Sequence, residues 1–162
     1  MSRGEPAPEF QDIQSWINSK PLTLQELRGK VVFLDFWTFD CINCVNTRPY
    51  FRRMYERLKD NRDFVMIGVH TPEFPYEKDP DNVKNAVVKF DLNYPIALDS
   101  YNTTWKLYGN HYWPRQAIID GQSRIRYTHI GEGDYHEMER KVMELLKENI
   151  GKIAPTQKTN SL

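Results

Sequence analysis

The sequence predicts an α/β protein with one mixed β-sheet flanked by helices on both faces. Two apolar, β-branched and aromatic runs, Val31–Trp37 and Phe64–Val69, are typical of strands buried on both faces of a parallel sheet. Between them, Phe51–Leu58 has apolar residues at positions i, i+3, i+4 and i+7, the spacing of an amphipathic helix that packs on such a sheet. Further along, Ala117–Asp120 and Ile125–Ile130 indicate an antiparallel hairpin because a Gly-Gln turn separates them.

The remaining elements follow from capping signals. Thr23 and Glu26 form a capping box, so a short helical turn is expected over Thr23–Leu27, and Gly29 ends it. Asp79 and Pro80 are typical of an N-cap and a first helical residue. They predict a helix that runs to about Phe90. A short strand, Ile96–Leu98, and a short helix then precede the hairpin. A last helix is expected from the capping box of Asp134 with Glu137 to about Gly151.

Length and composition predict one folded domain. The chain has 162 residues, of which 40% are apolar and 13% aromatic, so it can bury a real core. We expect a flexible N-terminus at residues 1–8, the domain at 9–151 and a flexible tail at 152–162, because both ends are polar and lack periodicity. Lys plus Arg and Asp plus Glu each number 22, so no basic excess favours nucleic acid as a partner. No apolar stretch approaches the roughly 18 to 20 residues of a membrane span.

The two cysteines of the chain, Cys41 and Cys44, follow the first apolar strand directly and open the helix. A thiolate at a helix N-terminus is stabilised by the unpaired N–H groups there. A spacing of three residues along a helix also brings the Cα atoms of the two cysteines within the roughly 4.4 to 6.8 Å that a disulfide spans. The pair therefore predicts thiol–disulfide exchange, in which Cys41 attacks and Cys44 resolves the mixed disulfide. Two buried small hydrophobic residues, or half of a zinc site, are the alternatives on spacing alone.

Asp35 interrupts the first apolar strand. Burying an unpaired carboxylate there costs on the order of several kcal/mol of folding free energy. Its distance from the cysteines in sequence allows it to lie beneath Cys44 with a pKa raised by desolvation. We therefore expect Asp35 to accept the Cys44 proton during resolution. The alternative is a structural aspartate hydrogen-bonded to the backbone.

These motifs together resemble the thioredoxin-fold disulfide oxidoreductases. The shared features are a strand with Asp35 and Trp37, the Cys41-x-x-Cys44 motif, Pro49 in the helix, and Trp113-Pro114 before the hairpin. The inserted helix and strand, and the N-terminal extension with APEF and LQELRGKVVFLDFW, resemble the TlpA, ResA and DipZ branch, with FWTFDCINC most similar to DipZ-type redoxin domains. The resemblance covers roughly residues 8–150 and implies a thioredoxin fold with an inserted α/β element.

The resemblance also implies site residues. Cys41 matches the nucleophile, Cys44 the resolving thiol and Asp35 the buried acid. Pro114 matches a cis-proline opposite the disulfide, where the backbone of Trp113 pairs with an extended client as an added strand. Glu73 matches an acid near the active site of ResA-like proteins, although its charged surroundings equally suit a solvated loop. The expected client-binding groove completes the set with Trp37, Phe39, Ile42, Asn43, Tyr112, Trp113 and Pro114.

The sequence departs from thioredoxin at two places. Ile42 and Asn43 replace the Gly-Pro between the cysteines, which leaves the direction of electron flow open because the dipeptide helps set the redox potential. Asp40 replaces the tryptophan before the first cysteine and adds a negative charge that opposes the Cys41 thiolate. We expect the helix N-terminus to prevail in part and Cys41 to be moderately reactive.

Two other functions remain open on the sequence. Thr38 lies three residues before Cys41, as in peroxiredoxins, and Arg115 is available to stabilise a peroxide-attacking thiolate. The proline that those enzymes place before the threonine is absent, since Leu34 is there. Alternatively, soft thiolates suit Cu(I), so the cysteines together with one histidine form a candidate metal-binding module. The four candidate histidines are His70, His111, His129 and His136.

The expected partners are protein thiols or disulfides and an upstream electron donor. No metal and no cofactor other than the Cys41–Cys44 disulfide is expected, and the domain is expected to be a monomer. The N-terminus lacks the charged-then-apolar pattern of an export signal, so the chain as it stands is expected to be cytoplasmic. If it is a trimmed domain, the resemblance to TlpA-like and DipZ-like proteins implies a place outside the cytoplasm.

Overall fold

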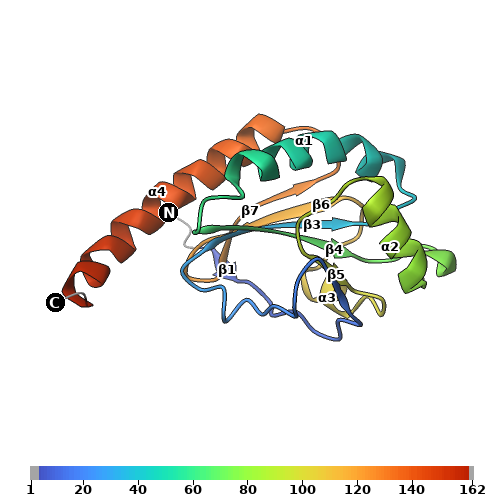
Figure 1. The fold of residues 1–162 in the computed structure, drawn as a ribbon, viewed down its shortest axis with the longest axis horizontal. Helices are drawn as coiled ribbons and strands as arrows, with labels where there is room; N and C mark the ends of the chain where they lie inside the picture. The colour runs from blue at the N-terminus through green and yellow to red at the C-terminus, as the bar shows by residue number, and fades with distance from the viewer. Residues whose placement is uncertain (1–3, 161–162) are drawn as a thin grey trace.

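The computed structural model of the chain describes residues 4–160, of which residues 150–160 are described by their backbone alone. The strands and helices of this part of the chain are drawn in Figure 1. The strands are β1 (Glu5–Pro6), β2 (Trp16–Ile17), β3 (Val31–Trp37), β4 (Phe64–His70), β5 (Ile96–Leu98), β6 (Arg115–Ile119) and β7 (Arg124–Ile130). The helices are α1 (Ile42–Leu58), the 3-10 helix η1 (Pro75–Lys78), α2 (Pro80–Lys89), α3 (Thr103–Leu107) and α4 (Tyr135–Asn160).

The described strands form one mixed sheet in the order β1-β7-β6-β3-β4-β5-β2. β3, β4 and β5 run parallel, whereas β6 is antiparallel to β3 and β7 is antiparallel to β6. All seven residues of β3 are buried, as expected for a central strand whose apolar run has no polar face. The register places Asp35 of β3 opposite Gln116 of β6.

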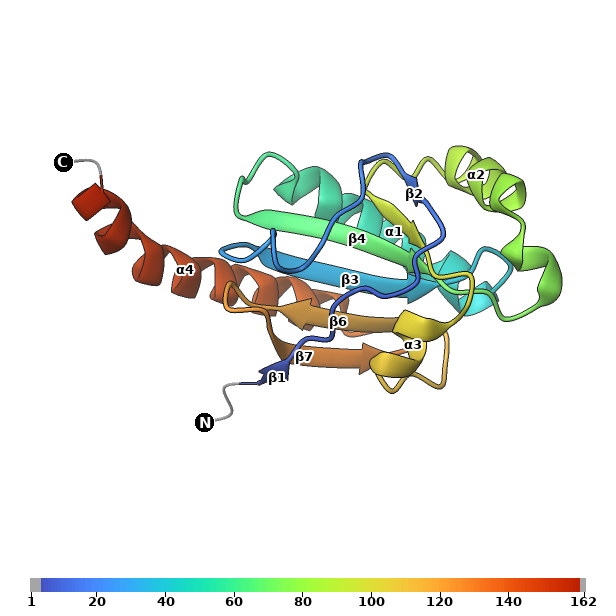
Figure 2. The ribbon, with the colours of Figure 1, turned by 90° about the horizontal axis from the view of Figure 1, so that it is seen from below.

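Two hydrophobic cores lie on opposite faces of the sheet. One core contains apolar side chains of α1, α2 and α4, among them Phe51, Val87 and Val142. The other is closed by α3 and by the N-terminal segment, which crosses that face of the sheet (Figures 1 and 2). The expected arrangement of helices on both faces is therefore confirmed, and irregular chain covers much of the second face.

The expected elements are present with small changes in their ends. The turn over Thr23–Leu27 has both capping-box bonds: Thr23 N–H to Glu26 Oε1 at 2.8 Å, and Glu26 N–H to Thr23 Oγ1 at 3.1 Å. Gly29 ends the turn with a φ of 94°, a conformation that glycine adopts at little cost. The hairpin strands begin one or two residues earlier than the sequence pattern predicts.

Two expectations about the termini are corrected. Within the N-terminal stretch expected to be flexible, Glu5–Pro6 forms β1, because its backbone pairs with Arg124 and Ile125 of β7. The sequence pattern predicts that the last helix ends near Gly151, but the backbone of α4 continues to Asn160, since a single glycine costs a helix only about 1 kcal/mol. Residues 1–3 and 161–162 lie outside the described part.

Candidate active site

The two thiols lie at the carboxyl end of β3, where α1 begins. Cys41 is the N-cap of α1 and is partly exposed, whereas Cys44, one turn later, is only 2% exposed. Both cysteines are in the free thiol form. The backbone N–H of Cys44 donates to the Sγ of Cys41 at 3.3 Å, so the sulfur of Cys41 is the atom that caps the helix. This places the accessible sulfur at the positive end of the helix, as the sequence predicts.

The surroundings of Cys41 favour its thiolate. Its pKa is lowered from 9.0 to about 7, chiefly by a hydrogen bond from the Cys44 thiol. Partial burial acts in the opposite direction, and the backbone N–H groups of Cys44 and Asn43 lower the pKa further. The negative charge that raises the pKa of Cys41 comes from Glu73. A thiol with a pKa of about 7 is about half ionised at neutral pH.

Cys44 is held as the thiol. Burial raises its pKa strongly, and the ionised forms of Cys41 and Asp35 raise it further. The backbone N–H of Thr38 partly offsets these effects. Cys44 therefore reacts only when a base takes its proton, which makes the buried carboxylate next to it chemically relevant.

Asp35 is 2% exposed and lies on the same side of β3 as α1. Burial raises its pKa from 3.8 to about 7, an effect that Gln116 and Arg48 partly counteract. Gln116 is its neighbour across the strand pair, yet Asp35 Oδ1 and Gln116 Nε2 both lack a hydrogen-bond partner among the described residues. A buried carboxyl group that titrates near pH 7 is suited to accept and return a proton.

Arg48 belongs to this site although we did not predict it. It lies one turn after Cys44 on the buried face of α1 and is 8% exposed. Its guanidinium carbon lies 3.2 Å from the centroid of the Phe90 ring, a cation–π contact. Burial lowers its pKa, and the negative charge of Asp35 counteracts part of this effect. The signal was present in the sequence, because positions 44, 48 and 51 share one helical face.

The Trp113–Pro114 peptide bond is cis, as the resemblance implies. The carbonyl oxygen of Trp113 lies 4.0 Å from the Sγ of Cys41, so this loop faces the accessible thiol. The indole N–H of Trp113 donates to the carbonyl of Thr71 at 2.8 Å, and its ring stacks on Trp105 with 4.0 Å between centroids. The loop is thereby held at the carboxyl end of the sheet.

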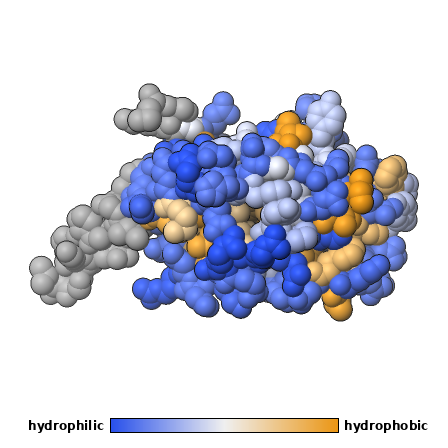
Figure 3. Space-filling view, turned by 90° about the horizontal axis from the view of Figure 1, so that it is seen from above, coloured by the Kyte–Doolittle hydropathy of each residue, from blue (hydrophilic) through white to orange (hydrophobic). Residues whose placement is uncertain are grey.

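Most of the expected groove residues are at least partly exposed, but two of them, Trp37 and Pro114, are buried. Ile42 and Tyr112 are 69% and 66% exposed, Asn43 is exposed, and Phe39 is half-buried. Hydrophobic side chains gather at the right-hand end of the face shown in Figure 3, the end at which α1 begins. Trp37, however, is only 2% exposed, because it lies on the α1 side of β3 and packs edge-on against His70. It supports the site from below and cannot touch a client.

The residues of the peroxidase hypothesis do not meet at Cys41. Arg115 pairs with Phe36 in the sheet, and both lie on the face opposite to Asp35 and α1. Thr38 is fully buried, with its hydroxyl 3.4 Å from His70 Nε2. Alternation along the strands thus separates Arg115 from the thiols, which residue spacing in the sequence could not reveal.

The histidines are distributed over the molecule. His70 is buried, its pKa is lowered to about 3 by burial, and its Nε2 accepts the N–H of Phe39 at 3.3 Å. His129 contacts Gln116 and Asp134, while His111 and His136 are exposed. Within residues 4–160, no three His, Cys, Asp or Glu side chains are grouped so as to hold a metal ion.

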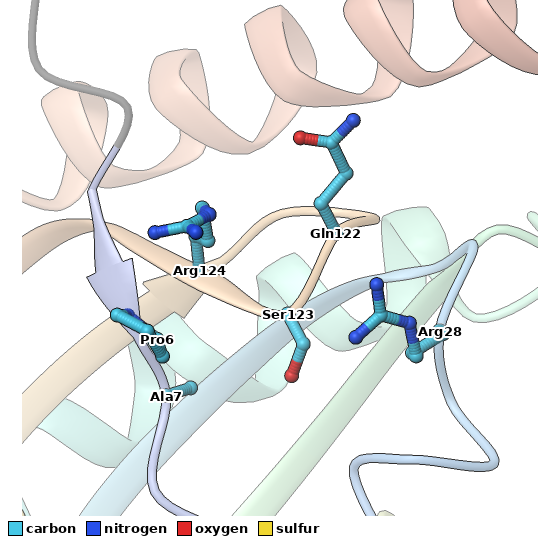
Figure 4. A pocket seen from close by; sticks show the side chains of 6 residues that line it. All are labelled: Pro6, Ala7, Arg28, Gln122, Ser123 and Arg124. Carbon is cyan, nitrogen blue, oxygen red and sulfur yellow. The ribbon is translucent and has the colours of Figure 1, made fainter.

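Two pockets differ in their relation to the thiols. One of about 380 Å³ adjoins the site and is lined by Phe39, Tyr76 and Phe90, among others. Another of about 460 Å³ lies at the opposite end of β3, beside the hairpin turn (Figure 4). The second pocket contains neither cysteine and is lined by Pro6, Ala7, Arg28, Gln122, Ser123 and Arg124.

Four features together define the class of protein. They are a mixed sheet of this strand order, a thiol at the N-cap of the first long helix, a second thiol one turn later and a cis-proline loop opposite the thiols. That class is the thiol–disulfide oxidoreductases of thioredoxin fold. The chain belongs to the Redoxin family, whose model matches residues 2–146.

Curated relatives and solved structures agree with this class. The chain is 43% identical over 145 residues to "Protein DipZ" of Mycobacterium tuberculosis (strain CDC 1551 / Oshkosh), covering 88% of this chain and 21% of that protein. It is 29% identical to "Thiol-disulfide oxidoreductase ResA" of Bacillus cereus (strain ATCC 10987 / NRS 248), covering 96% of this chain and 80% of that protein. The crystal structure of a thiol-disulfide isomerase from Corynebacterium glutamicum superposes with a TM-score of 0.77 and 28% identity, over 86% of this chain and 96% of that one.

The chain thus spans about a fifth of the length of the DipZ relatives that it matches. In the part of the chain that the structure describes, no helix has the length and apolar character needed to cross a membrane.

Proposed function

We propose that this domain exchanges a Cys41–Cys44 disulfide with disulfides or thiols of client proteins, with Cys41 as the nucleophile and Cys44 as the resolving thiol. The observation that carries the proposal is the pair of thiols at the start of α1. One is accessible with a pKa lowered to about 7, and the other is buried with a raised pKa. The cysteine pair is the redox group, so the exchange needs no other cofactor.

In the reductive direction, the Cys41 thiolate attacks one sulfur of a client disulfide. A Cys41–client bond forms, and the other client sulfur leaves as a thiolate that takes a proton from solvent. The Cys44 thiol then gives its proton to the Asp35 carboxylate and attacks the Sγ of Cys41. The second client thiolate leaves, the Cys41–Cys44 disulfide is closed, and two electrons have passed to the client. A donor dithiol reverses the last steps and restores the reduced pair.

Client binding uses the surface around Cys41. We propose that an extended client segment pairs with the backbone of Trp113 next to the cis-proline Pro114, as an added strand. The exposed side chains of Ile42 and Tyr112, with the half-buried Phe39, supply apolar contact on either side of the thiol. Asn43 lies at the same rim.

The proposal is tested with two serine variants and a disulfide-linked peptide. Cys41→Ser is expected to abolish turnover, whereas Cys44→Ser is expected to accumulate a mixed disulfide that mass spectrometry detects. The double variant is the matched control and should form no adduct. Full turnover by both single variants would contradict the proposal, and peroxide consumption by the wild-type protein through a Cys41 sulfenic acid would favour a peroxidase instead.

The direction of electron flow follows from the reduction potential of the pair. Equilibration against a glutathione or dithiothreitol series, read by mass-tagging of free thiols, gives this potential. A value near or below about −250 mV indicates a reductant, and a value near about −150 mV indicates an oxidant or isomerase.

A further inference from the structure

Glu77 is a buried carboxylate in an otherwise exposed, charged segment. It lies in η1 and is 1% exposed, whereas its neighbours Tyr76 and Lys78 are exposed. Its two oxygens accept three backbone N–H groups: Oε1 from Glu73 at 3.0 Å and from Phe74 at 2.8 Å, and Oε2 from Asp40 at 3.1 Å. Each bond has the length of a charge-assisted hydrogen bond or slightly more.

These three N–H groups belong to two segments that flank the reactive thiol. Asp40 directly precedes Cys41, the N-cap of α1. Glu73 is the acid whose charge raises the pKa of Cys41. One carboxylate side chain therefore bridges the loop that carries the nucleophile and the loop that carries the acid acting on it.

Further contacts keep Glu77 in place. Its own N–H donates to the carbonyl of Phe74 at 3.0 Å, which closes the first turn of η1. Next to it, the hydroxyl of Tyr76 donates to the side-chain carboxylate of Asp40. Burying a carboxylate costs on the order of several kcal/mol unless hydrogen bonds compensate for the lost water. Glu77 is therefore stable in this position only while both loops present their N–H groups to it.

We propose that Glu77 is a positioning residue that holds the Glu73 loop against the Cys41 loop, so that the charge of Glu73 acts on the thiol at a fixed distance. This role rests on the proposed function in one respect, because it takes Cys41 as the reacting thiol. The other ionisable groups near Cys41 are the Asp40 carboxylate directly before it, the Cys44 thiol on α1 and the buried Asp35 and Arg48. Among the described residues, no side chain of this set forms a hydrogen bond with Glu77, and Asp40 contacts it through the backbone N–H alone, so a cycle with Glu73 isolates the bridge.

The test is a double-mutant cycle of Glu73→Gln with Glu77→Gln. Glutamine keeps the volume of Glu77 but has a single acceptor oxygen, so it can bond one loop and turns its NH₂ group toward the N–H of the other. The readout is the pH midpoint of Cys41 alkylation in the reduced protein. Glu73→Gln is expected to lower this midpoint in the wild-type background. In the Glu77→Gln background the same substitution is expected to produce less than half of that shift.

Tyr76→Phe is the matched control, because it removes the neighbouring side-chain bond to Asp40 and leaves the three backbone bonds of Glu77 intact. In this variant the Glu73→Gln shift should keep its wild-type size. An equal shift in the wild-type and Glu77→Gln backgrounds, with both proteins folded by circular dichroism, would overturn the proposal.

A second measurement on the unmutated protein holds even if Glu77→Gln does not fold. Asp40, Glu73 and Phe74 are exposed residues whose backbone N–H groups all donate to Glu77, so the exchange rates of these three amides report on the bridge. We expect the three amides to be protected and to exchange at similar rates, and exchange at unprotected rates would refute the bridge. Neither experiment uses a client, so a protein without disulfide-exchange activity that passed both would refute the proposed function and leave Glu77 as a positioning residue.

Discussion

Asp35 is the side chain on which the chemistry and the stability of the domain oppose each other. Burial raises its pKa to about 7, so at neutral pH a large share of the protein carries a negative charge in its core that Gln116 and Arg48 stabilise only in part. An amide of the same shape avoids that cost. A proton acceptor near the buried Cys44 thiol is what the proposed mechanism gains in return.

The first prediction concerns catalysis. Asp35→Asn is expected to slow the resolution of the mixed disulfide, because no carboxylate remains to take the Cys44 proton. The wild-type rate of client release should rise with pH through about 7, and the variant should lose this inflection. Stopped-flow measurement of client release between pH 5 and 9 checks it. An unchanged pH profile would remove Asp35 from the mechanism.

The second prediction concerns stability. Because the pKa of Asp35 is higher in the folded protein than in the unfolded chain, its contribution is fully present below about pH 4 and is lost as the pH rises through about 7. Asp35→Asn should therefore gain stability relative to wild type between pH 4 and 8, by a few kcal/mol at about 1.4 kcal/mol per pKa unit. Urea unfolding of both reduced proteins at the two pH values gives the difference. A pH-independent difference would contradict the assigned pKa.

At the scale of the element, α1 organises the site. Its N-cap is the sulfur of Cys41, its first turn buries Cys44, and its second turn buries Arg48 beneath the ring of Phe90. Pro49 lies inside the same helix, as the resemblance implies. The spacing of a single helix thus sets a partly exposed thiol, a buried thiol and a buried cation on successive turns.

The third prediction follows from Arg48. Its positive charge lowers the pKa of Asp35, so Arg48→Met, which keeps an apolar stem of similar length, should raise the midpoint of Asp35 above about 7. NMR titration of the Asp35 carboxyl carbon measures the change. Arg52→Met is the control, because Arg52 lies one turn further along, is exposed and pairs with Asp91 at 2.8 Å. Equal midpoints in the two variants would show that Arg48 has no special role.

At the scale of the whole molecule, the N-terminal segment is part of the fold. Its apolar residues, including Phe10 and Trp16, pack on the face of the sheet opposite to α1. Glu9 ties this segment to the turn before β3, since its carboxylate accepts the N–H groups of Phe10, Leu24 and Gln25 at 2.8 to 3.1 Å. The strand that positions the active site is therefore supported from a distant part of the chain.

The fourth prediction tests this support. Glu9→Ala leaves three backbone N–H groups without their acceptor and is expected to lower the free energy of unfolding by about 1 to 3 kcal/mol. Urea unfolding checks the value, with Glu26→Gln as a control that alters a more exposed carboxylate in the same turn. A loss below about 0.5 kcal/mol, the range of ordinary surface substitutions, would mean that the segment contributes little.

The sequence by itself determined the local features of the protein. The central strands, α1 and α2, the turn capped by Thr23 and the position of the two cysteines at a helix N-terminus all follow from periodicity, capping residues and spacing within a few residues. These signals are local because a strand or a helix is specified by neighbours two to four positions apart. The buried acid could be recognised for the same reason, since a charge inside an apolar strand needs a purpose.

Only the tertiary structure decided what depends on pairing between distant segments. Glu5–Pro6 becomes a strand because β7 offers its edge, and Gln116 faces Asp35 because β6 returns beside β3 in that register. Strand alternation buries Trp37 and turns Arg115 to the far face. Glu77 lies 37 residues after Asp40 in the chain and can bond to it only because β3 and β4 lie side by side. No local pattern encodes these contacts, because each is fixed by the burial and hydrogen bonding of the folded sheet as a whole.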